Sequence, residues 1–231
     1  MSNLVTVCKQ PAHSSLNNRR ERPIDFCLLN TRSIRKKALI VKDIAVDMNL
    51  DIIAPTETCL HSGHEDDQLI GELCPSGYNF LHVPRLNRPG GGVGLSFKNS
   101  LKFKKKQGFE FTSFQYLDAF LADQLCVRIL VVYHPPPSEM NGFSASLFYD
   151  EFSSLLEQLA VSLESFVIVG DFNFHIDDHS DTQARRFLLI LDNFDLKQLV
   201  SQSTHERGHT LDLIISRSDD ADYFLLRITA A

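Results

Sequence analysis

No stretch of the 231-residue sequence approaches the roughly 18 consecutive apolar residues that a membrane-spanning helix requires, so we expect no membrane span. The N-terminal segment also lacks an apolar core of signal-peptide length, which predicts a location in the nucleus or cytoplasm and not secretion. The five cysteines are odd in number and include no C-x-x-C pair. This pattern predicts buried free thiols in a reducing compartment and not a zinc site.

Basic residues are in the minority, with 23 Lys and Arg against 29 Asp and Glu and a net charge of −6. A protein that coats nucleic acid is usually basic, because phosphate neutralisation dominates its affinity. The acidic balance therefore argues against simple coating. It is compatible with an enzyme that gathers carboxylates around a divalent cation, since the ion inverts the local charge. A hydrophobic content of 43% in a chain of this length is enough to form a sizeable core.

The first 23 residues are polar and contain a basic cluster at residues 19–22, so we predict a disordered leader there and one folded domain over residues 24–231. A short apolar run at 24–30, helical spacing of apolar residues over 34–48 and a second apolar run at 51–57 predict strand, helix, strand. If the two strands are parallel, their polar ends meet at the same edge of a sheet.

Further strands and helices are predicted by the same patterns along the rest of the chain. Strand-like runs are found at 78–83, 92–97, 109–122, 125–133, 165–173, 210–216 and 222–229, and amphipathic helices at 143–163 and 183–193. Alternating strands and helices with several hairpin-like pairs predict mixed sheets.

Acids and amides follow or interrupt several of these apolar runs, namely Asn30, Glu57, Asp171, Asn173 and Asp212, and Tyr133 ends another. A carboxylate in an apolar run is costly unless it is paired, hydrogen-bonded or metal-bound. If these elements form one sheet system, the polar groups converge at one rim. Hard oxygen ligands of this kind suit Mg²⁺, which often uses one or two carboxylates and a substrate phosphate. The inferred chemistry is phosphoryl transfer or phosphodiester hydrolysis.

The motifs NTRSI, TETCL, GGGVG, YHPPPS, GDFNFH and THERGHTLDLIIS occur in this order between residues 30 and 216. The chain thereby resembles the endonuclease domains of non-LTR (LINE-type) retrotransposons, which belong to the endonuclease/exonuclease/phosphatase superfamily. The resemblance implies a four-layer α/β sandwich, in which two mixed β-sheets pack face to face with helices outside, here C-terminally shortened. It also implies Mg²⁺ or Mn²⁺ as cofactor, DNA as partner, no small-molecule cofactor and a monomer.

The resemblance implies a role for each matching residue. Glu57 resembles the principal metal-binding carboxylate, with Asn30 beside it. Tyr133 resembles the phenol that contacts the scissile phosphate. Asp171 resembles the residue that handles the attacking water or the leaving oxygen, Asn173 its companion, and Asp212 the acid that orients a catalytic histidine. Substrate contacts are expected from Thr204, Arg32 and His134.

Each residue also has a plainer explanation. Taken alone, Asn30 is better explained as a helix N-cap, and Thr31 or Ser33 could cap equally well. Glu57 alone could be a surface turn residue and Tyr133 a core phenol, while Asp171 and Asn173 fit an Asx-type turn. The histidines 175, 179, 205 and 209 match no zinc pattern and are explained by surface loops. The lysines at 102–106 are typical of a solvated edge.

The pattern breaks at its C-terminal end, because no histidine follows His209. Where the family carries Ser-Asp-His, this chain has Asp220-Ala221-Asp222. Loss of a general acid–base group typically costs about 10²- to 10⁴-fold in rate. Cys59 also replaces a tryptophan of the family, and His134 replaces an arginine. Three functions stay open: a weakened Mg²⁺-dependent DNA endonuclease, an inactive relic that binds nucleic acid or protein, and a phosphoesterase acting on a small phosphorylated substrate.

Overall fold

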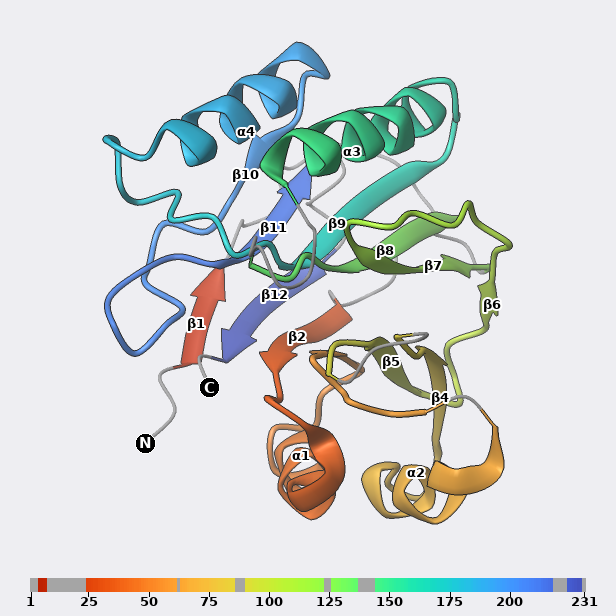
Figure 1. The fold of residues 1–231 in the computed structure, drawn as a ribbon. Coiled ribbons are helices and arrows are strands. Elements are labelled where there is room, and N and C mark those ends of the chain that lie inside the picture. The colour runs from red at the N-terminus through yellow and green to blue at the C-terminus, as the bar shows by residue number, and fades with distance from the viewer. Residues whose placement is uncertain are drawn as a thin grey trace, which may run out of the picture.

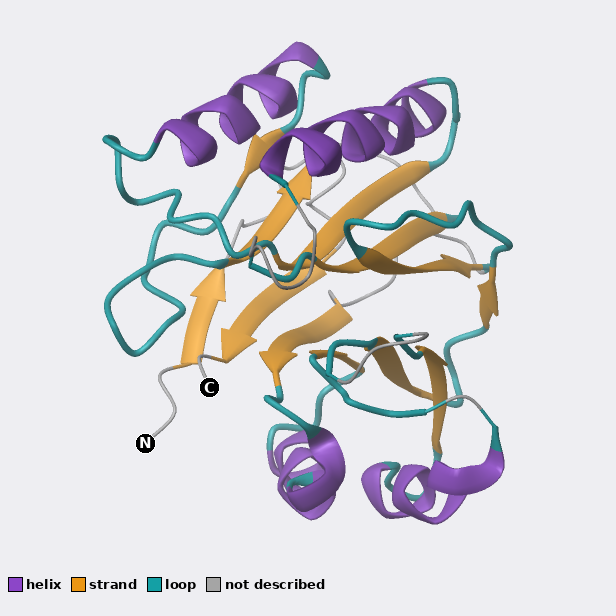
Figure 2. Cartoon of the chain, viewed as in Figure 1, coloured by secondary structure: helices purple, strands orange, loops and turns teal. Residues whose placement is uncertain are grey.

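Two six-stranded sheets lie face to face at the centre of the computed structural model, and helices cover both outer faces (Figure 1). The structure describes residues 4–7, 24–61, 63–85, 90–122, 126–136, 144–217 and 224–229, of which 4–7 and 224–229 are described by backbone alone. Figure 2 shows the same layers by secondary structure. The predicted four-layer α/β sandwich is confirmed.

The first sheet has the strand order β1-β12-β2-β3-β5-β4. Its members are β1 (Leu4–Val7), β2 (Ile24–Asn30), β3 (Ile52–Thr56), β4 (Tyr78–Val83), β5 (Val93–Lys98) and β12 (Phe224–Thr229). Strand β2 is parallel to both β3 and β12, and the other pairs are antiparallel. The sheet is therefore mixed, and it brings the predicted late strand β12 beside β2.

The second sheet has the order β10-β11-β9-β8-β7-β6. Its members are β6 (Phe103–Lys105), β7 (Gln115–Leu121), β8 (Val127–Tyr133), β9 (Ser165–Asp171), β10 (Lys197–Gln198) and β11 (Asp212–Ser216). Only β8 and β9 are parallel. Strand β6 forms one edge, and its Lys104 and Lys105 are exposed, in agreement with the predicted solvated edge.

The helices divide between the two outer faces. The short helices η1 (Ile34–Lys36) and η2 (His64–Asp66) precede α1 (Ala38–Asp47) and α2 (Asp67–Leu73), which cover the first sheet, and α3 (Ala145–Ala160) and α4 (Thr182–Asn193) cover the second (Figure 1). Ser144 caps the N-terminus of α3, and its side chain accepts a hydrogen bond from Leu147 N. Asp181 caps the N-terminus of α4, and its side chain accepts from the backbone N–H groups of Gln183 and Ala184. Both are favoured N-cap residues.

Three apolar cores hold these layers together. Between the sheets lie residues such as Leu28, Leu95 and Val131. Between the second sheet and its helices lies an aromatic core of many phenylalanines, among them Phe148 and Phe187. Smaller aliphatic residues pack α1 and α2 on the first sheet. Strands buried on both faces explain the near-continuous apolar runs of the sequence.

Some elements differ from the sequence-based expectation. Leu4–Val7, inside the predicted disordered leader, forms β1 and pairs with β12, while 1–3 and 8–23 lie outside the described residues. The strand predicted over 109–122 begins only at Gln115. The preceding backbone donates instead to side chains: Phe109 N to Tyr116 OH, and Thr112 N to Glu151. Helix α2 and strands β6 and β10 were not predicted. No helix in the described part of the chain is long and apolar enough to cross a membrane.

Candidate active site

The carboxyl ends of two parallel strand pairs meet at one rim of the sandwich. Strands β2 and β3 end together in the first sheet, where Asn30 pairs in register with Thr56. Strands β8 and β9 end together in the second sheet, where Tyr133 pairs with Asp171. Asp212 begins β11 directly beside Asp171. Parallel pairing therefore places polar groups from distant parts of the sequence at one edge.

A small cleft of about 90 Å³ opens at this rim. It is lined by Asn30, Arg32, Glu57, Asp171, Asn173, Thr204, His205, Leu211 and Asp212. Seven of these were predicted as site residues from sequence. A volume of this size takes a few water molecules, an ion or one phosphate group inside the cleft, and the rest of a larger substrate would lie outside it.

Asn30 joins the two sheets at the cleft. Its side-chain amide nitrogen donates to Glu57 Oε1 at 3.0 Å and to Asp171 Oδ2 at 2.8 Å. Glu57 follows β3 of the first sheet and Asp171 ends β9 of the second. One amide thus uses both of its hydrogens to hold two carboxylates from different sheets. Asn30 is therefore not the helix cap that the sequence taken alone favoured.

Several residues around the cleft have left-handed backbone. These are Arg32 (φ 43°), Ser33 (φ 78°), Glu57 (φ 50°), Cys59 (φ 54°) and Asn173 (φ 54°). Each such residue that is not glycine costs about 1–3 kcal/mol and persists only where its surroundings enforce it. Here, Arg32 N donates to Asn30 Oδ1 and Ser33 N donates to the Glu57 carbonyl oxygen. This concentration of strain is typical of a functional site.

The carboxylates of the cleft are held in a setting that disfavours their charge. Burial, and then the neighbouring Asp212 and Glu57, raise the pKa of Asp171 well above its usual range. Burial raises the pKa of Asp212 to about 7, although a hydrogen bond from Thr204 opposes the rise. Oδ1 of Asp212 is buried and has no hydrogen-bond partner among the described residues. Burial and the mutual repulsion of the acids therefore both disfavour the ionised forms.

Tyr133 ends β8 next to Asp171 of β9, and it is not among the residues that line the cleft. It is buried, and burial together with the charges of Glu57 and Asp171 raises the pKa of its phenol. A phenol is protonated at neutral pH even at its ordinary pKa of about 10, so this group can donate a hydrogen bond to an oxyanion. Gly91 packs against it so closely that a Cβ atom there would lie 3.2 Å from Tyr133 Cε1. The glycine run is thus a close-packed turn beside the cleft.

Asp171 and Asn173 form the expected Asx turn and also line the cleft. Asn173 N donates to Asp171 Oδ1 at 3.1 Å, and Asn173 Nδ2 donates to the carbonyl oxygen of His134 at 2.8 Å. Thr204 is buried, and its hydroxyl accepts from the backbone N–H groups of Leu211 and Asp212. Both the turn and the threonine fix the backbone that presents the acids.

The prediction that His134 binds substrate is wrong. Its side chain is 0% exposed and points into the aromatic core, with its ring 4.1 Å from that of Phe148 and 5.1 Å from that of Phe174. Nδ1 lies 2.8 Å from the carbonyl oxygen of Phe172. Burial lowers the pKa of His134 to about 4, so the ring is neutral at pH 7. His134 shapes the site only through its backbone.

His205 and Leu211 are the two lining residues that sequence reasoning missed, and His205 is the polar one. The signal was its position next to Thr204 in the THERGHTLDL motif. Its Nε2 lies 3.2 Å from Nη2 of Arg32 at the mouth of the cleft. His175 and His209 stack face to face at 4.0 Å, and His209 pairs with Asp177. These two rings serve loop packing, as the sequence indicated.

The donor set fits a Mg²⁺ or Mn²⁺ ion that shares its coordination with substrate. Within the described ranges, no group of three or more His, Cys, Asp or Glu residues is close enough to hold a metal ion unaided. Mg²⁺ commonly uses one or two carboxylates and takes its other ligands from water and phosphate. Glu57 and Asn30 supply hard oxygen atoms at the cleft, and Asp171 adds a buried carboxylate beside them.

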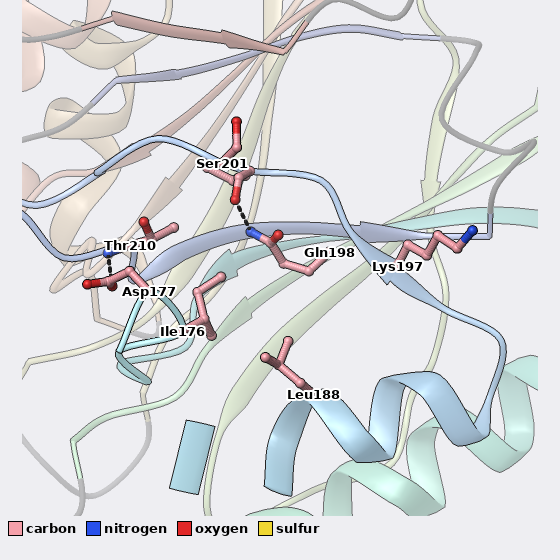
Figure 3. A pocket seen from close by; sticks show the side chains of 8 residues that line it. Ile176, Asp177, Leu188, Lys197, Gln198, Ser201 and Thr210 are labelled. Carbon is pink, nitrogen blue, oxygen red and sulfur yellow. Dashed lines mark hydrogen bonds between the residues drawn. The ribbon is translucent and has the colours of Figure 1, made fainter. Parts of the chain in front are cut away.

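A larger hollow of about 390 Å³ lies elsewhere, beside α4 and β10 (Figure 3). Three of its polar side chains, those of Asp177, Gln198 and Thr210, are already hydrogen-bonded. Asp177 accepts from Thr210 N at 2.7 Å, and Gln198 Nε2 donates to the carbonyl oxygen of Val200 at 2.8 Å. Ile176 and Leu188 line the rest of it. Size alone favours this hollow, but convergent acids and strained backbone favour the smaller cleft.

Comparison with known proteins gives one family match. Residues 16–223 match the model described as the Endonuclease/Exonuclease/phosphatase family. Among curated proteins, no sequence matches significantly.

Solved structures of low sequence identity share the fold. The AP endonuclease LMAP from Leishmania major superimposes with a TM-score of 0.67 at 18% identity, over 86% of this chain and 80% of that one. The endonuclease domain of TRAS1, a telomere-specific non-LTR retrotransposon, gives 0.64 at 10% identity, over 86% of each chain. The 3′ phosphatase NExo from Neisseria, bound to product DNA hairpin, gives 0.59 at 13% identity, over 83% and 85%. At these identities the likeness establishes the fold alone.

Proposed function

Because the chain belongs to the Endonuclease/Exonuclease/phosphatase family, we propose that it is a Mg²⁺- or Mn²⁺-dependent phosphodiesterase that nicks DNA, descended from a non-LTR retrotransposon endonuclease. The observation that carries the proposal is the Asn30 amide, which holds Glu57 and Asp171 together in one small cleft. The ordered motifs from NTRSI to THERGHTLDLIIS support the retrotransposon origin.

Glu57 and Asn30 would hold the cation. A divalent ion there supplies electrostatic stabilisation of the charge that develops on the phosphate oxygens. Tyr133, whose phenol is protonated at neutral pH and whose pKa is raised further by burial, donates to a non-bridging oxygen of the phosphate. Rigid donors placed before the reaction contribute most when they point to where negative charge develops.

Asp171 is the proton acceptor of the proposed reaction. Its carboxylate is fixed by Asn30 on one oxygen and by Asn173 N on the other. A carboxyl whose pKa is raised toward neutrality accepts a proton from water more readily than an ordinary one. Asn173 is held by the His134 carbonyl oxygen and helps to orient that water.

Asp212 is the position at which the proposed activity is weakened. Its Oδ1 is buried and unpartnered in the described part of the chain, as expected for an acid whose histidine partner is missing. Asp220-Ala221-Asp222, which stands in place of the family's Ser-Asp-His motif, lies outside the described residues. Without imidazole we expect a rate about 10²- to 10⁴-fold below that of a complete site.

The test is nicking of supercoiled plasmid with Mg²⁺, comparing the wild type with Glu57→Gln and Asp171→Asn. Glu157→Gln, on the exposed face of α3, removes the same charge far from the cleft and serves as the control. We expect slow nicking that requires the metal, survives in the control and is lost in both site variants. Equal nicking by all four proteins would contradict the proposal.

Chemical rescue examines the role of Asp212 separately. Free imidazole added to the reaction should accelerate nicking by the wild type, because the buried carboxylate can orient the added base. The same addition should do nothing for Asp212→Asn. If no metal-dependent nicking occurs with or without imidazole, the chain is instead an inactive binding module of this family.

A further inference from the structure

The mouth of the cleft carries a charge arrangement that the proposed hydrolysis does not use. Arg32 Nη1 donates to Glu206 Oε1 at 3.0 Å, and Arg32 Nη2 lies 3.2 Å from His205 Nε2. The inner wall of the same cleft is acidic, with Glu57, Asp171 and Asp212. The Arg32 guanidinium thus lies at the rim of the cleft, where it is paired with the Glu206 carboxylate.

Hydrogen bonds donated by backbone N–H groups fix both sides of this rim. Arg32 is fixed in its left-handed conformation because its N–H donates to Asn30 Oδ1 at 3.0 Å. Opposite it, a tight turn is closed by Gly208 N donating to the His205 carbonyl oxygen at 2.9 Å and by His205 N donating to that of His209. Gly208 has a φ of 88°, which the turn requires. The Arg32 guanidinium is therefore presented by rigid supports.

The His205 ring meets more hydrogen-bond donors than it can accept from. The two ring nitrogens of His205 face two N–H groups, from Arg32 Nη2 at 3.2 Å and from Arg207 N at 3.3 Å. A neutral imidazole accepts at only one nitrogen, so one donor is left over. Surplus donors around a guanidinium are the surroundings that an anion with several acceptor oxygens would satisfy.

The ion pair between Arg32 and Glu206 is weak. The side chains of Arg32 and Glu206 are 41% and 64% exposed, and exposed pairs contribute little because water screens them. A phosphate presents more acceptor oxygens to the same planar guanidinium and can bind it in a bidentate manner. A phosphate can therefore replace the Glu206 carboxylate at little cost.

We propose that Arg32, with the 205–207 turn, forms a second phosphate-binding site, which takes a backbone phosphate next to the one that is cleaved. Glu206 forms an ion pair with Arg32 until that phosphate displaces the Glu206 carboxylate. The inference rests on the proposed phosphodiesterase function and deepens it. It names the substrate as a strand with at least two consecutive phosphates. Because Arg32 lines the same cleft as Asp171, groups bound at the two residues are neighbours, as successive phosphates of one strand are.

The test measures binding without cleavage, in EDTA, by fluorescence anisotropy of a short fluorescein-labelled DNA duplex. Glu206→Gln should bind about two- to five-fold more tightly than the wild type, the range expected from removing one exposed competing pair. Arg32→Gln should bind more weakly and should lower the slope of log affinity against log salt by about 1. Glu157→Gln should match the wild type.

The double variant Arg32→Gln/Glu206→Gln separates a competing carboxylate from a general charge effect. If Glu206 acts through Arg32, its substitution changes nothing once Arg32 is gone. Equal tightening in both backgrounds would show long-range repulsion only and would overturn the inference, as would no tightening in either.

Competitors with one and two phosphates check the substrate class. A trinucleoside diphosphate should displace the duplex better than a dinucleoside monophosphate, and this advantage should vanish in Arg32→Gln. An advantage that persists in Arg32→Gln would place the second phosphate elsewhere. Metal-dependent nicking lost in Asp171→Asn without any Glu206 effect would refute only this inference, whereas absence of DNA binding by every protein would refute the proposed function as well.

Discussion

Acid should destabilise this protein partly through one buried histidine, His134. Its ring lies in the aromatic core between the second sheet and α3, where Nδ1 faces the carbonyl oxygen of Phe172 at 2.8 Å. Nε2 is buried and has no partner among the described residues, so a proton there would have nothing to donate to. Burial accordingly lowers the pKa of His134 from 6.5 to about 4.

The size of the effect follows from these two values. Between pH 6.5 and about 4 the unfolded chain binds a proton at this position and the folded chain does not, so acid favours unfolding. At about 1.4 kcal/mol per pH unit, His134 alone lowers the free energy of unfolding by roughly 3 kcal/mol across this window. Its contribution to stability is complete above pH 6.5 and lost below about pH 4.

Asp212 acts in the opposite direction. Its pKa is raised to about 7 in the fold, so the folded chain binds the extra proton below that pH and acid favours folding through this group. The total pH dependence is a sum of such terms, and only the difference between wild type and a His134 variant isolates the histidine.

The assay is urea unfolding followed by far-UV circular dichroism, because the chain has no tryptophan to report by fluorescence. Near pH 7.5, His134→Phe should be about 1–2 kcal/mol less stable than wild type, since the Phe172 carbonyl oxygen loses its donor. By pH 4 this deficit should shrink or reverse by roughly 3 kcal/mol. His64→Gln, at a side chain that is 97% exposed, should run parallel to the wild type. A constant gap between His134→Phe and wild type at all pH values would refute the reasoning.

Three further outcomes are expected. Without metal, Asp212→Asn should raise the free energy of unfolding by roughly 2–4 kcal/mol at pH 8 and leave it unchanged near pH 3. The reason is that the substitution removes a buried carboxylate that is ionised at pH 8, its pKa being raised to about 7. Equal denaturant midpoints of the two proteins at pH 8 would contradict this prediction. Gly170→Ala should lower the free energy of unfolding by about 3 kcal/mol or more, since at a φ of 155° a Cβ atom there would overlap the Val132 carbonyl oxygen. Gly71→Ala, in open space on α2, should raise the free energy of unfolding by about 0.5–1 kcal/mol. Thermal melts that rank the two variants the other way would be inconsistent with this packing. Mg²⁺ should raise the melting temperature of the wild type but not of Glu57→Gln, and a shift retained in that variant would mean that the ion binds elsewhere.

The strands and longer helices could be predicted because apolar periodicity determines which face is buried. Helix α4 and strand β9 match their predicted ranges closely. Elements as short as β10, with two residues, carry too little pattern to be recognised. The strand expected over 109–122 was too long because the sequence does not show that Glu151 of α3 would accept the backbone N–H groups of Thr112 and Ser113.

The sequence identified most residues of the site but not the contacts between them. The Asn30 side chain could either cap a helix or bridge two carboxylates, and the partner that decides between these roles, Asp171, lies 141 residues away. The prediction for His134 failed because it depended on the position of the residue in a motif and ignored the direction in which its side chain points. Successive side chains of extended backbone point to opposite faces, so the residue after Tyr133 faces α3 when Tyr133 faces the other sheet.

The chain also divides almost cleanly between the sheets. Apart from β1 and β12, the strands of the first sheet come from residues 24–98 and those of the second from residues 103–216. The link between these blocks is the short turn from Lys98 to Phe103, yet Asn30 and Asp171, which touch in the cleft, belong to different blocks. A chain cut at this turn would carry Glu57 on one fragment and Asp171 and Asp212 on the other. Its cleft would then report reassembly of the two pieces, which makes the fold a natural scaffold for a two-fragment proximity sensor.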